Sequence, residues 1–294
     1  MKNIKILLLL CIVIMIFFQF GCNKKNDDLD NNQEENEIQY YSDGLTYSLS
    51  DDKNSYIVTG FTSDANYICI PDTYQGLPVT DLGTGAFQNS IMKEIIIGKN
   101  VKDMGWYVFD NCQNLSKFIV QEENEYYSTE DDILFNYDKS SLVCYPQNKS
   151  GSKYIIPEYV SDLCYFAFES SNYLQEVTIS KNIKVIEGSC FAGCEKLETV
   201  ILPDGLLEIT RNAFNGCNNL KNINIPNTVT TISSYAFYNC SSLETISIPI
   251  SVYSIGEKAF YECPSLTIKC EQTKKPSSWS KEWVSRRTTV LWNQ

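Results

Sequence analysis

The sequence of 294 residues contains no histidine. Ser–His–Asp and Cys–His catalysis, histidine-ligated zinc or haem, and pH sensing by imidazole are therefore excluded together. Arginine is scarce as well: Arg211, Arg286 and Arg287 are the only three, and the formal net charge is −12. We expect no nucleic-acid partner, because phosphate recognition needs clustered basic side chains. The lack of the commonest general base also argues against an enzyme, so we predict no catalytic residue.

Metal-ligand motifs are missing too, although the chain has twelve cysteines. No C-x-x-C pair occurs, which argues against zinc and iron–sulfur sites. The acidic run that contains Asp28 and Asp30 has no glycine where the turn of a calcium loop requires one. We therefore expect neither a metal nor a cofactor.

The N-terminus has no apolar run long enough to span a bilayer. Lys2 and Lys5 precede an apolar stretch of 15 residues, from Ile6 to Phe20. A spanning helix needs roughly 20 residues, so this stretch suits a secretory signal peptide. The Gly21–Cys22 pair that follows resembles the lipobox of bacterial lipoproteins. This resemblance implies that residues 1–21 are removed and that Cys22 carries a lipid; the alternative is an ordinary signal peptide with a chance cysteine.

The body of the chain repeats with a period of 23 residues, or 22 in its first unit. Phenylalanines mark the repeat, each after a small or aliphatic residue: Phe87, Phe109, Phe168, Phe191, Phe214, Phe237 and Phe260. Cysteine follows five of them three residues later: Cys112, Cys194, Cys217, Cys240 and Cys263. The unit reads C-x-x-L-x-x-I-x-I-P-x-x-V-x-x-I-x-x-x-A-F-x-x. Such self-similarity indicates a repeat architecture.

Each unit predicts one coil of a solenoid. In L-x-x-I-x-I the alternation turns two aliphatic side chains inward and the residue between them outward, as in a strand. The following proline ends the strand, because it cannot donate a backbone hydrogen bond. The A-F-x-x-C segment favours a short helical turn whose phenylalanine enters the core. One unit cannot bury a core alone, so only stacked units are expected to fold.

These marks resemble the BspA-like branch of the leucine-rich-repeat family. The resemblance runs from about Tyr40 to Gln294 and includes the opening Ile70–Pro71 and Ala86–Phe87 pairs. It implies a right-handed coil with a parallel β-sheet on one face, short helical turns or irregular segments on the other, and a hairpin cap at the N-terminus. It also implies a bacterial surface lipoprotein.

The predicted organisation has three parts, of which the last is one leucine-rich-repeat domain. After the signal peptide (1–21), residues 22–39 are acidic and lack aromatic side chains, so we expect a disordered tether. The repeat domain spans residues 40–294, and the insertion within it explains the 59-residue gap between Phe109 and Phe168. Its parts are an N-terminal cap (40–66, strands 45–49 and 56–61), first repeats (67–120), a hairpin insertion (121–153), 23-residue repeats (154–263) and a C-terminal cap (264–294).

The repeated cysteines are expected to be reduced. Equivalent positions of stacked coils lie about 4.8 Å apart, a Cα separation that would permit disulfides. Their Cβ vectors run parallel instead of toward each other, so we predict buried thiols lining the turn after each phenylalanine. The pairing of Cys69, Cys144 and Cys164, which stand outside this ladder, stays open.

The outward strand positions form the candidate binding surface. After Cys69 they are Ile96, Ile119, Ile155, Thr178, Ile201, Asn224 and Ser247, which we call the strand-face row. An exposed apolar stripe is a candidate protein-binding surface. The alternative is that the insertion folds down and covers it.

These observations predict an exported, lipid-anchored protein of the bacterial cell surface that binds macromolecules without catalysis. The family resemblance implies adhesion or protein–protein interaction, with a host extracellular protein as one kind of partner. The alternative is a carbohydrate-binding or structural protein of the envelope. A glycan hydrolase would need two acids converging about 5–10 Å apart in a cleft, and no such pair stands out in the sequence.

Overall fold

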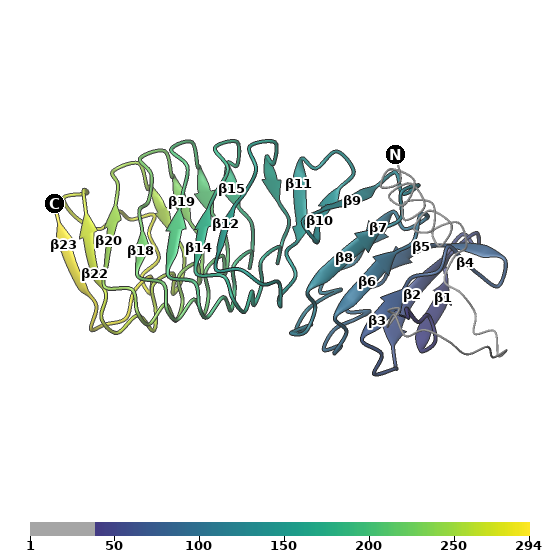
Figure 1. Ribbon diagram of the computed structural model, residues 1–294. Coiled ribbons are helices and arrows are strands. Elements are labelled where there is room, and N and C mark those ends of the chain that lie inside the picture. Colours follow the sequence, from purple (N-terminus) through teal and green to yellow (C-terminus); the bar gives the residue numbers. More distant parts are fainter. Residues whose placement is uncertain (1–38) are drawn as a thin grey trace, which may run out of the picture.

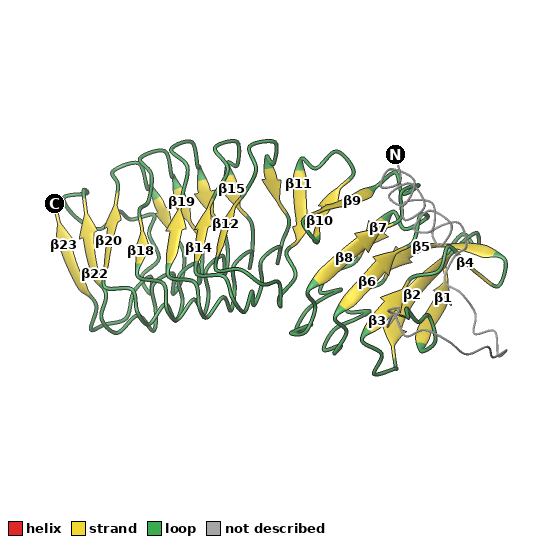
Figure 2. Cartoon of the chain, in the orientation of Figure 1, coloured by secondary structure: helices red, strands yellow, loops and turns green. Residues whose placement is uncertain are grey.

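The computed structural model describes residues 39–294, which form an elongated β-solenoid (Figure 1). Signal peptide, Cys22 and nearly all of the tether lie outside these residues. Each coil contributes two short strands, and successive coils pair these strands in parallel, so two rows of strands run along the molecule. Residues 39–294 contain strands and turns and no helix (Figure 2). The predicted repeat solenoid is confirmed.

The first strand row carries the outward positions identified in the sequence. Its hydrogen-bonded groups are β3-β6-β8, β12-β14-β16-β18 and β20-β22-β23. The strands are β3 (Tyr67–Cys69), β6 (Glu94–Ile97), β8 (Lys117–Val120), β12 (Lys153–Ile155), β14 (Glu176–Thr178), β16 (Thr199–Ile201), β18 (Asn222–Ile223), β20 (Thr245–Ile248), β22 (Thr267–Cys270) and β23 (Thr289–Trp292). Equivalent residues of successive units lie opposite one another, as Val177 and Val200 do, so the 23-residue period is also the register of the sheet.

The second strand row was not expected from the sequence as a separate sheet. It begins at the second apolar pair of each unit, where Ile186 lies opposite Ile209 and Ile209 opposite Ile232. Its strands are β5 (Leu77–Leu82), β7 (Asp103–Met104), β13 (Asp162–Leu163), β15 (Val185–Ile186), β17 (Glu208–Ile209), β19 (Thr231–Ile232) and β21 (Ser254–Ile255).

An antiparallel hairpin lies at the N-terminal end of the coils. β1 (Leu45–Leu49) pairs with β2 (Tyr56–Phe61), and β2 runs parallel to β5. The short β4 (Thr73–Tyr74) returns antiparallel on β5. Tyr47 and Tyr74 stack with their ring centroids 3.9 Å apart. The hairpin therefore covers the edge of the second strand row, which would otherwise present unpaired backbone groups.

The segment around each phenylalanine is a pair of tight turns instead of the expected helical turn. In the unit of Phe214, the residues two before and two after it, Asn212 and Gly216, have φ of 59° and 75°. The other six units show the same left-handed pair, which an α-helix cannot contain. The Phe214 N–H donates to Ala236 O of the next coil at 2.8 Å. Backbone groups thus bond between coils, where a helix would bond within one.

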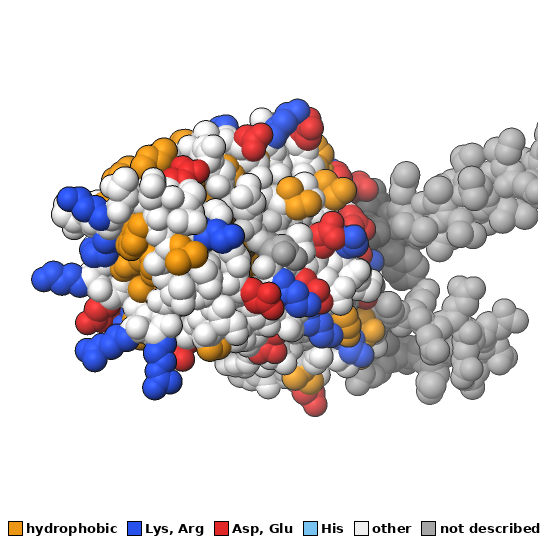
Figure 3. Space-filling model, turned by 90° about the vertical axis from the view of Figure 1, so that its left-hand side faces the viewer, with side chains coloured by type: hydrophobic (Ala, Val, Ile, Leu, Met, Phe, Trp, Pro, Cys, Tyr) orange, Lys and Arg blue, Asp and Glu red, His pale blue; other side chains and the backbone are white. Residues whose placement is uncertain are grey.

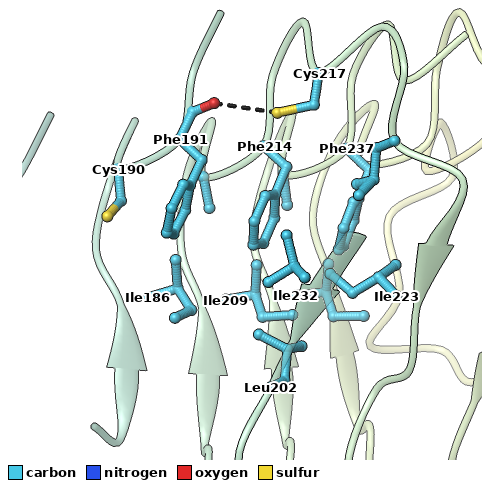
Figure 4. Close-up of a cluster of buried hydrophobic side chains, with 14 of the residues drawn as sticks. Ile186, Cys190, Phe191, Leu202, Ile209, Phe214, Cys217, Ile223, Ile232 and Phe237 are labelled. Carbon is cyan, nitrogen blue, oxygen red and sulfur yellow. Dashed lines mark hydrogen bonds between the residues drawn. The ribbon is translucent and has the colours of Figure 1, made fainter. Parts of the chain in front are cut away.

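The phenylalanines stack along the core. From Phe168 to Phe260 neighbouring ring centroids lie 4.8–5.3 Å apart and the ring planes differ by at most 16°. Figure 4 shows the rings of Phe191, Phe214 and Phe237 in line, each above an isoleucine of the second strand row. The solenoid core is therefore one continuous column in this part of the chain.

The repeated cysteines are free, as predicted, and each donates its thiol to the carbonyl oxygen of the phenylalanine one coil earlier. Cys217 donates to Phe191 O at 3.1 Å, drawn as the dashed line in Figure 4. Burial raises the pKa of Cys112, Cys194 and Cys263 to about 12. Cys144 and Cys164 are free as well.

The insertion is stacked in line with the coils and separates two cores (Figure 1). β9 (Tyr127–Glu130), β10 (Ile133–Asn136) and β11 (Ser141–Cys144) form an antiparallel meander, and β11 continues in parallel to β13. On β10, Leu134 packs into the N-terminal core, whereas Ile133 and Phe135 pack into the C-terminal core. We call residues 40–120 the N-terminal block and residues 154–294 the C-terminal block.

The C-terminal segment is built as one more coil. β23 pairs in parallel with β22. Trp283 follows Phe260 by 23 residues, and its backbone carbonyl oxygen accepts the Phe260 N–H at 2.9 Å. Trp279 is buried and packs edge-on against Trp283 at 4.9 Å. Residues 264–294 carry six basic and two acidic residues. Figure 3 looks onto this end and shows Lys and Arg side chains gathered at one side of it.

Candidate functional site

The strand-face row divides into two groups because the insertion lies between β8 and β12. Ile96 lies opposite Ile119 in the N-terminal block. In the C-terminal block Ile155, Thr178 and Ile201 lie opposite one another in turn. Asn224 and Ser247 follow one residue after Ile223 and Ile246 and are exposed. The period thus places these side chains in line within each block, but the row is not continuous along the molecule.

The two groups differ in exposure. Ile155 is 71% exposed and Ile201 is 48% exposed, whereas Ile96 and Ile119 are half-buried. The insertion therefore leaves Ile155 and Ile201 uncovered, because it stacks end-on between the blocks instead of lying across the sheet. An isoleucine that is mostly exposed on a sheet contributes apolar surface available to another molecule.

The row continues further than the sequence indicated. Lys269 lies opposite Ser247 on one side and Leu291 on the other, and both Lys269 and Leu291 are exposed. Sequence reasoning missed them because the apolar marks of the repeat end at Leu266. The spacing contained the signal, since 247, 269 and 291 differ by 22.

A shallow groove of about 400 Å³ lies on this face beside Ile201 and Asn224. The side chains of Thr199 and Thr245 line it as well, together with Lys221. Lys221 forms an exposed ion pair with Glu198 at 3.0 Å, and such surface pairs contribute little stability. The groove therefore combines β-branched apolar side chains with hydroxyl and amide groups, and Lys221 is the charged side chain that lines it.

Two carboxyl groups do converge, at a place that the sequence did not reveal. Glu169 shares a hydrogen bond with Asp110 in the cleft between the two blocks, and burial followed by the Asp110 charge raises the pKa of Glu169 to about 8. Carboxyls in hydrogen-bond contact leave no room for a glycosidic oxygen or a water, which the roughly 5–10 Å spacing in glycoside hydrolases provides. Sequence reasoning missed the pair because the insertion separates its members by 59 residues.

Two further properties concern anchoring and metals. Residues 39–294 contain no helix long and apolar enough to cross a bilayer. In the same residues no three Cys, Asp or Glu side chains converge as a metal site would require. The predicted lipidation residue, Cys22, lies outside the part of the chain that the structure describes.

Stacked 23-residue coils with a parallel strand row and a phenylalanine column define a solenoid of the leucine-rich-repeat type. The profile of the BspA type leucine rich repeat region matches six copies in this chain, over residues 61–131 and 141–267. The chain therefore belongs to the BspA-type leucine-rich-repeat family, as its motifs predicted.

Solved structures share this fold. The pneumococcal vaccine antigen PcpA is similar with a TM-score of 0.65 at 21% identity, over 80% of this chain and 64% of that one, less than two thirds of its length. A leucine-rich repeat protein from Bacteroides ovatus is similar with a TM-score of 0.52 at 23% identity, over 87% and 67% of the two chains. At these identities the likeness shows the fold alone. No curated protein matches the chain.

Proposed function

We propose that this protein is exported, anchored to the bacterial membrane by a lipid on Cys22, and displayed at the cell surface, where it binds another protein without catalysis. The signal-like N-terminus with its Gly21–Cys22 pair supports export and lipidation. Membership of the BspA-type family supports an interaction role. A host extracellular protein is the kind of partner that the family resemblance implies.

The observation that carries the binding role is the exposure of Ile155 and Ile201, with Thr178 between them in register. Thr178 and Ile201 belong to strands paired on both sides, and Ile155 belongs to β12, the end strand of the same sheet, which pairs with β14. The side chains of the row are therefore the groups that this face presents to a partner. Protein–protein interfaces have an apolar centre, and Ile155 and Ile201 are the exposed apolar side chains of this part of the row. The strand-face row contains no aromatic side chain on which a sugar ring could stack, so it favours a protein over a glycan.

The binding role can be tested with paired variants. The double variant Ile155→Lys/Ile201→Lys should lose capture of an extracellular host protein in a pull-down read by mass spectrometry. Ile250→Lys is the matched control, because Ile250 is 68% exposed but lies outside the row, in the turn after β20. Retention of the same partner by the double variant would exclude the row as the binding surface.

Anchoring has a separate test. Cys22→Ala removes the sulfur that would carry the lipid, so the protein should move from the membrane fraction to the soluble fraction or the medium. Fractionation followed by immunoblotting measures this distribution. A variant that stays in the membrane fraction would reject lipidation at Cys22 and would leave the binding role of the row untouched.

A further inference from the structure

A cleft of about 420 Å³ opens where the two blocks meet. Elsewhere in the solenoid each coil packs directly on the next. Here the insertion lies between the strands of the coil that ends at Asp110 and those of the coil that ends at Glu169, while the turns of the two coils still contact each other. Equivalent positions of the two coils, 59 residues apart in sequence, therefore both line the cleft: Trp106 with Tyr165, Tyr107 with Phe166, and Asp110 with Glu169.

The insertion takes over the contacts that a neighbouring coil would make. Tyr145 N–H donates to Ala167 O at 2.7 Å, the bond that a phenylalanine makes in the regular coils, and its ring stacks on Phe168 at 5.1 Å. Gln147 Nε2 donates to Phe109 O at 3.4 Å, the role that a ladder thiol has elsewhere. The cleft is thus lined by both flanking coils and by the insertion that takes the place of a coil between them.

Gln147 leaves one strong acceptor without a partner. Its side chain is 5% exposed and lines the cleft, and its Oε1 atom has no hydrogen-bond partner. The amide orientation is fixed, because the atom that faces the Phe109 carbonyl oxygen must be the NH₂ group. A buried acceptor without a donor is unfavourable, so it indicates a place where a ligand supplies the N–H or O–H.

The other residues that line the cleft also favour a ligand that donates hydrogen bonds and carries a positive charge. Its formally charged side chains are Asp110 and Glu169, and it contains no Lys or Arg. The mouth is aromatic: Trp106 is 56% exposed and meets Tyr165 edge-on at 5.3 Å, while Tyr107 and Phe166 lie 4.7 Å apart. Aromatic faces attract cations and pack on apolar stems. Acidic acceptors inside and aromatic rings at the entrance together favour a cation on an apolar stem.

We propose that this junction cleft binds the ammonium group of a ligand with an apolar stem, such as a lysine side chain or an arylalkylamine. The carboxyl pair and Gln147 Oε1 accept hydrogen bonds from the three N–H groups, and the aromatic side chains enclose the stem. The cleft lies at the block junction and uses none of the strand-face row, so this site is independent of the proposed protein-binding surface.

Calorimetric titration of the full-length protein in non-ionic detergent tests the site with 2-phenylethylammonium as the probe. The neutral 2-phenylethanol has the same stem, so it should bind at least about tenfold more weakly. The Glu169 carboxyl keeps its proton up to a pKa of about 8, so the charge of the pair is removed by a change at Asp110. Asp110→Asn keeps the shape of the side chain and should weaken ammonium binding about tenfold. Glu195→Gln, an exposed acid outside the cleft, is the matched control and should leave the affinity unchanged.

A second variant keeps the test independent of the acid pair. Trp106→Ala removes a mostly exposed ring, so it should fold and still weaken the probe several-fold. Equal affinity for the ammonium and the alcohol, or ammonium binding that survives both variants, would overturn the proposal. Methyl glycosides that bind in place of the amine, and lose binding in Trp106→Ala, would overturn it in favour of a sugar site.

Discussion

The two blocks of the solenoid differ in how regularly the phenylalanine rings are spaced along their cores. In the C-terminal block the phenylalanine centroids lie 4.8–5.3 Å apart, close to the spacing of hydrogen-bonded strands. In the N-terminal block Phe87 and Phe109 lie 6.0 Å apart, and the core also takes in Phe61 and Phe118. A strict 23-residue period lets identical rings stack at the strand spacing. The shorter first unit breaks that match, so other aromatic side chains fill the space.

The junction shows what happens when the period is interrupted altogether. The layer from β9 to β11 supplies side chains to both cores, but it reproduces only part of a coil. Tyr145 takes the place of the phenylalanine ring and Gln147 takes the place of the thiol. The flanking coils contact each other at a few side chains, and a cleft remains between them and the insertion. Regular stacking thus produces a closed core, and its interruption produces the cleft that the structure describes.

Removing a stacked ring should give the largest difference between the blocks. Phe214 lies between two parallel rings at 5.3 and 5.2 Å, so Phe214→Ala should lower the free energy of unfolding by about 3–5 kcal/mol. Phe109 is slightly exposed and packs edge-on against Phe118, so Phe109→Ala should lose about 1–2 kcal/mol less. Urea unfolding followed by circular dichroism measures both, with Glu208→Gln at an exposed position as the surface control. Equal losses of unfolding free energy in the two variants would show that regular ring stacking adds nothing to stability.

Thiol labelling should separate the closed core from the junction. Burial raises the pKa of Cys164 to about 11, and the ladder thiols are raised as well, so all stay protonated near pH 8. Access then decides the rate. Cys164 lines the cleft and should react with iodoacetamide at least about a hundredfold faster than Cys217, a difference of roughly 2.8 kcal/mol. Mass spectrometry after timed labelling gives the rates, and denaturing urea should equalise them. Native Cys217 labelling at the rate of Cys164 would contradict a closed ladder.

Much of the fold could be predicted because the period encodes it directly. A residue repeated every 23 positions must recur at the same place in each coil, so the phenylalanine column and the thiol ladder followed from the sequence. The backbone conformation of the tight turns around each phenylalanine could not be predicted from the sequence. Asn212 and Tyr235 take the same left-handed backbone conformation, although tyrosine gives no hint of it. Glycines such as Gly193 and Gly216 carry the clearest signal, and asparagines such as Asn212 carry a weaker one.

The candidate sites were predicted less completely, for two physical reasons. Alternation along a strand identifies which side chains point outward, so it gave Ile155 and Ile201. It does not say what else lies nearby, so it could not distinguish them from the half-buried Ile96. The junction cleft depends on how far the insertion separates two coils, which is a packing outcome of about thirty residues without a period. Only the equal offset of Asp110 and Glu169 from their phenylalanines hinted at it.

Replacing outward isoleucines by lysine should produce a smaller difference between the blocks in the loss of unfolding free energy. Ile96→Lys/Ile119→Lys places two ammonium groups at half-buried positions and should lower the free energy of unfolding by about 1–3 kcal/mol. The double variant at the exposed Ile155 and Ile201 should stay within about 0.5 kcal/mol per site. Thermal and urea unfolding measure both variants. A C-terminal double variant that loses as much as the N-terminal one would mean that Ile155 and Ile201 belong to the core.

The most localised expected effect is a pH dependence of stability that belongs to the junction alone. The folded protein keeps the Glu169 proton up to a pKa of about 8, whereas the unfolded chain releases it near 4.5. Because the folded state holds the extra proton between these values, raising the pH through this window lowers the stability of the wild type. Glu169→Gln cannot titrate. Stability of the wild type minus that of the variant should therefore fall between about pH 5 and pH 8 and level off above.

The other groups around Glu169 keep this test specific. Asp110 faces it from the preceding coil, and the thiols of Cys144 and Cys194 face it from the insertion and the following coil. Burial raises the pKa of both thiols, so they remain neutral through the window and contribute no slope. Asp110→Asn removes the like charge and should shift the fall in stability to lower pH. If the difference between wild type and Glu169→Gln instead rises with pH, Glu169 is ionised in the fold, and the shared proton at the block junction does not exist.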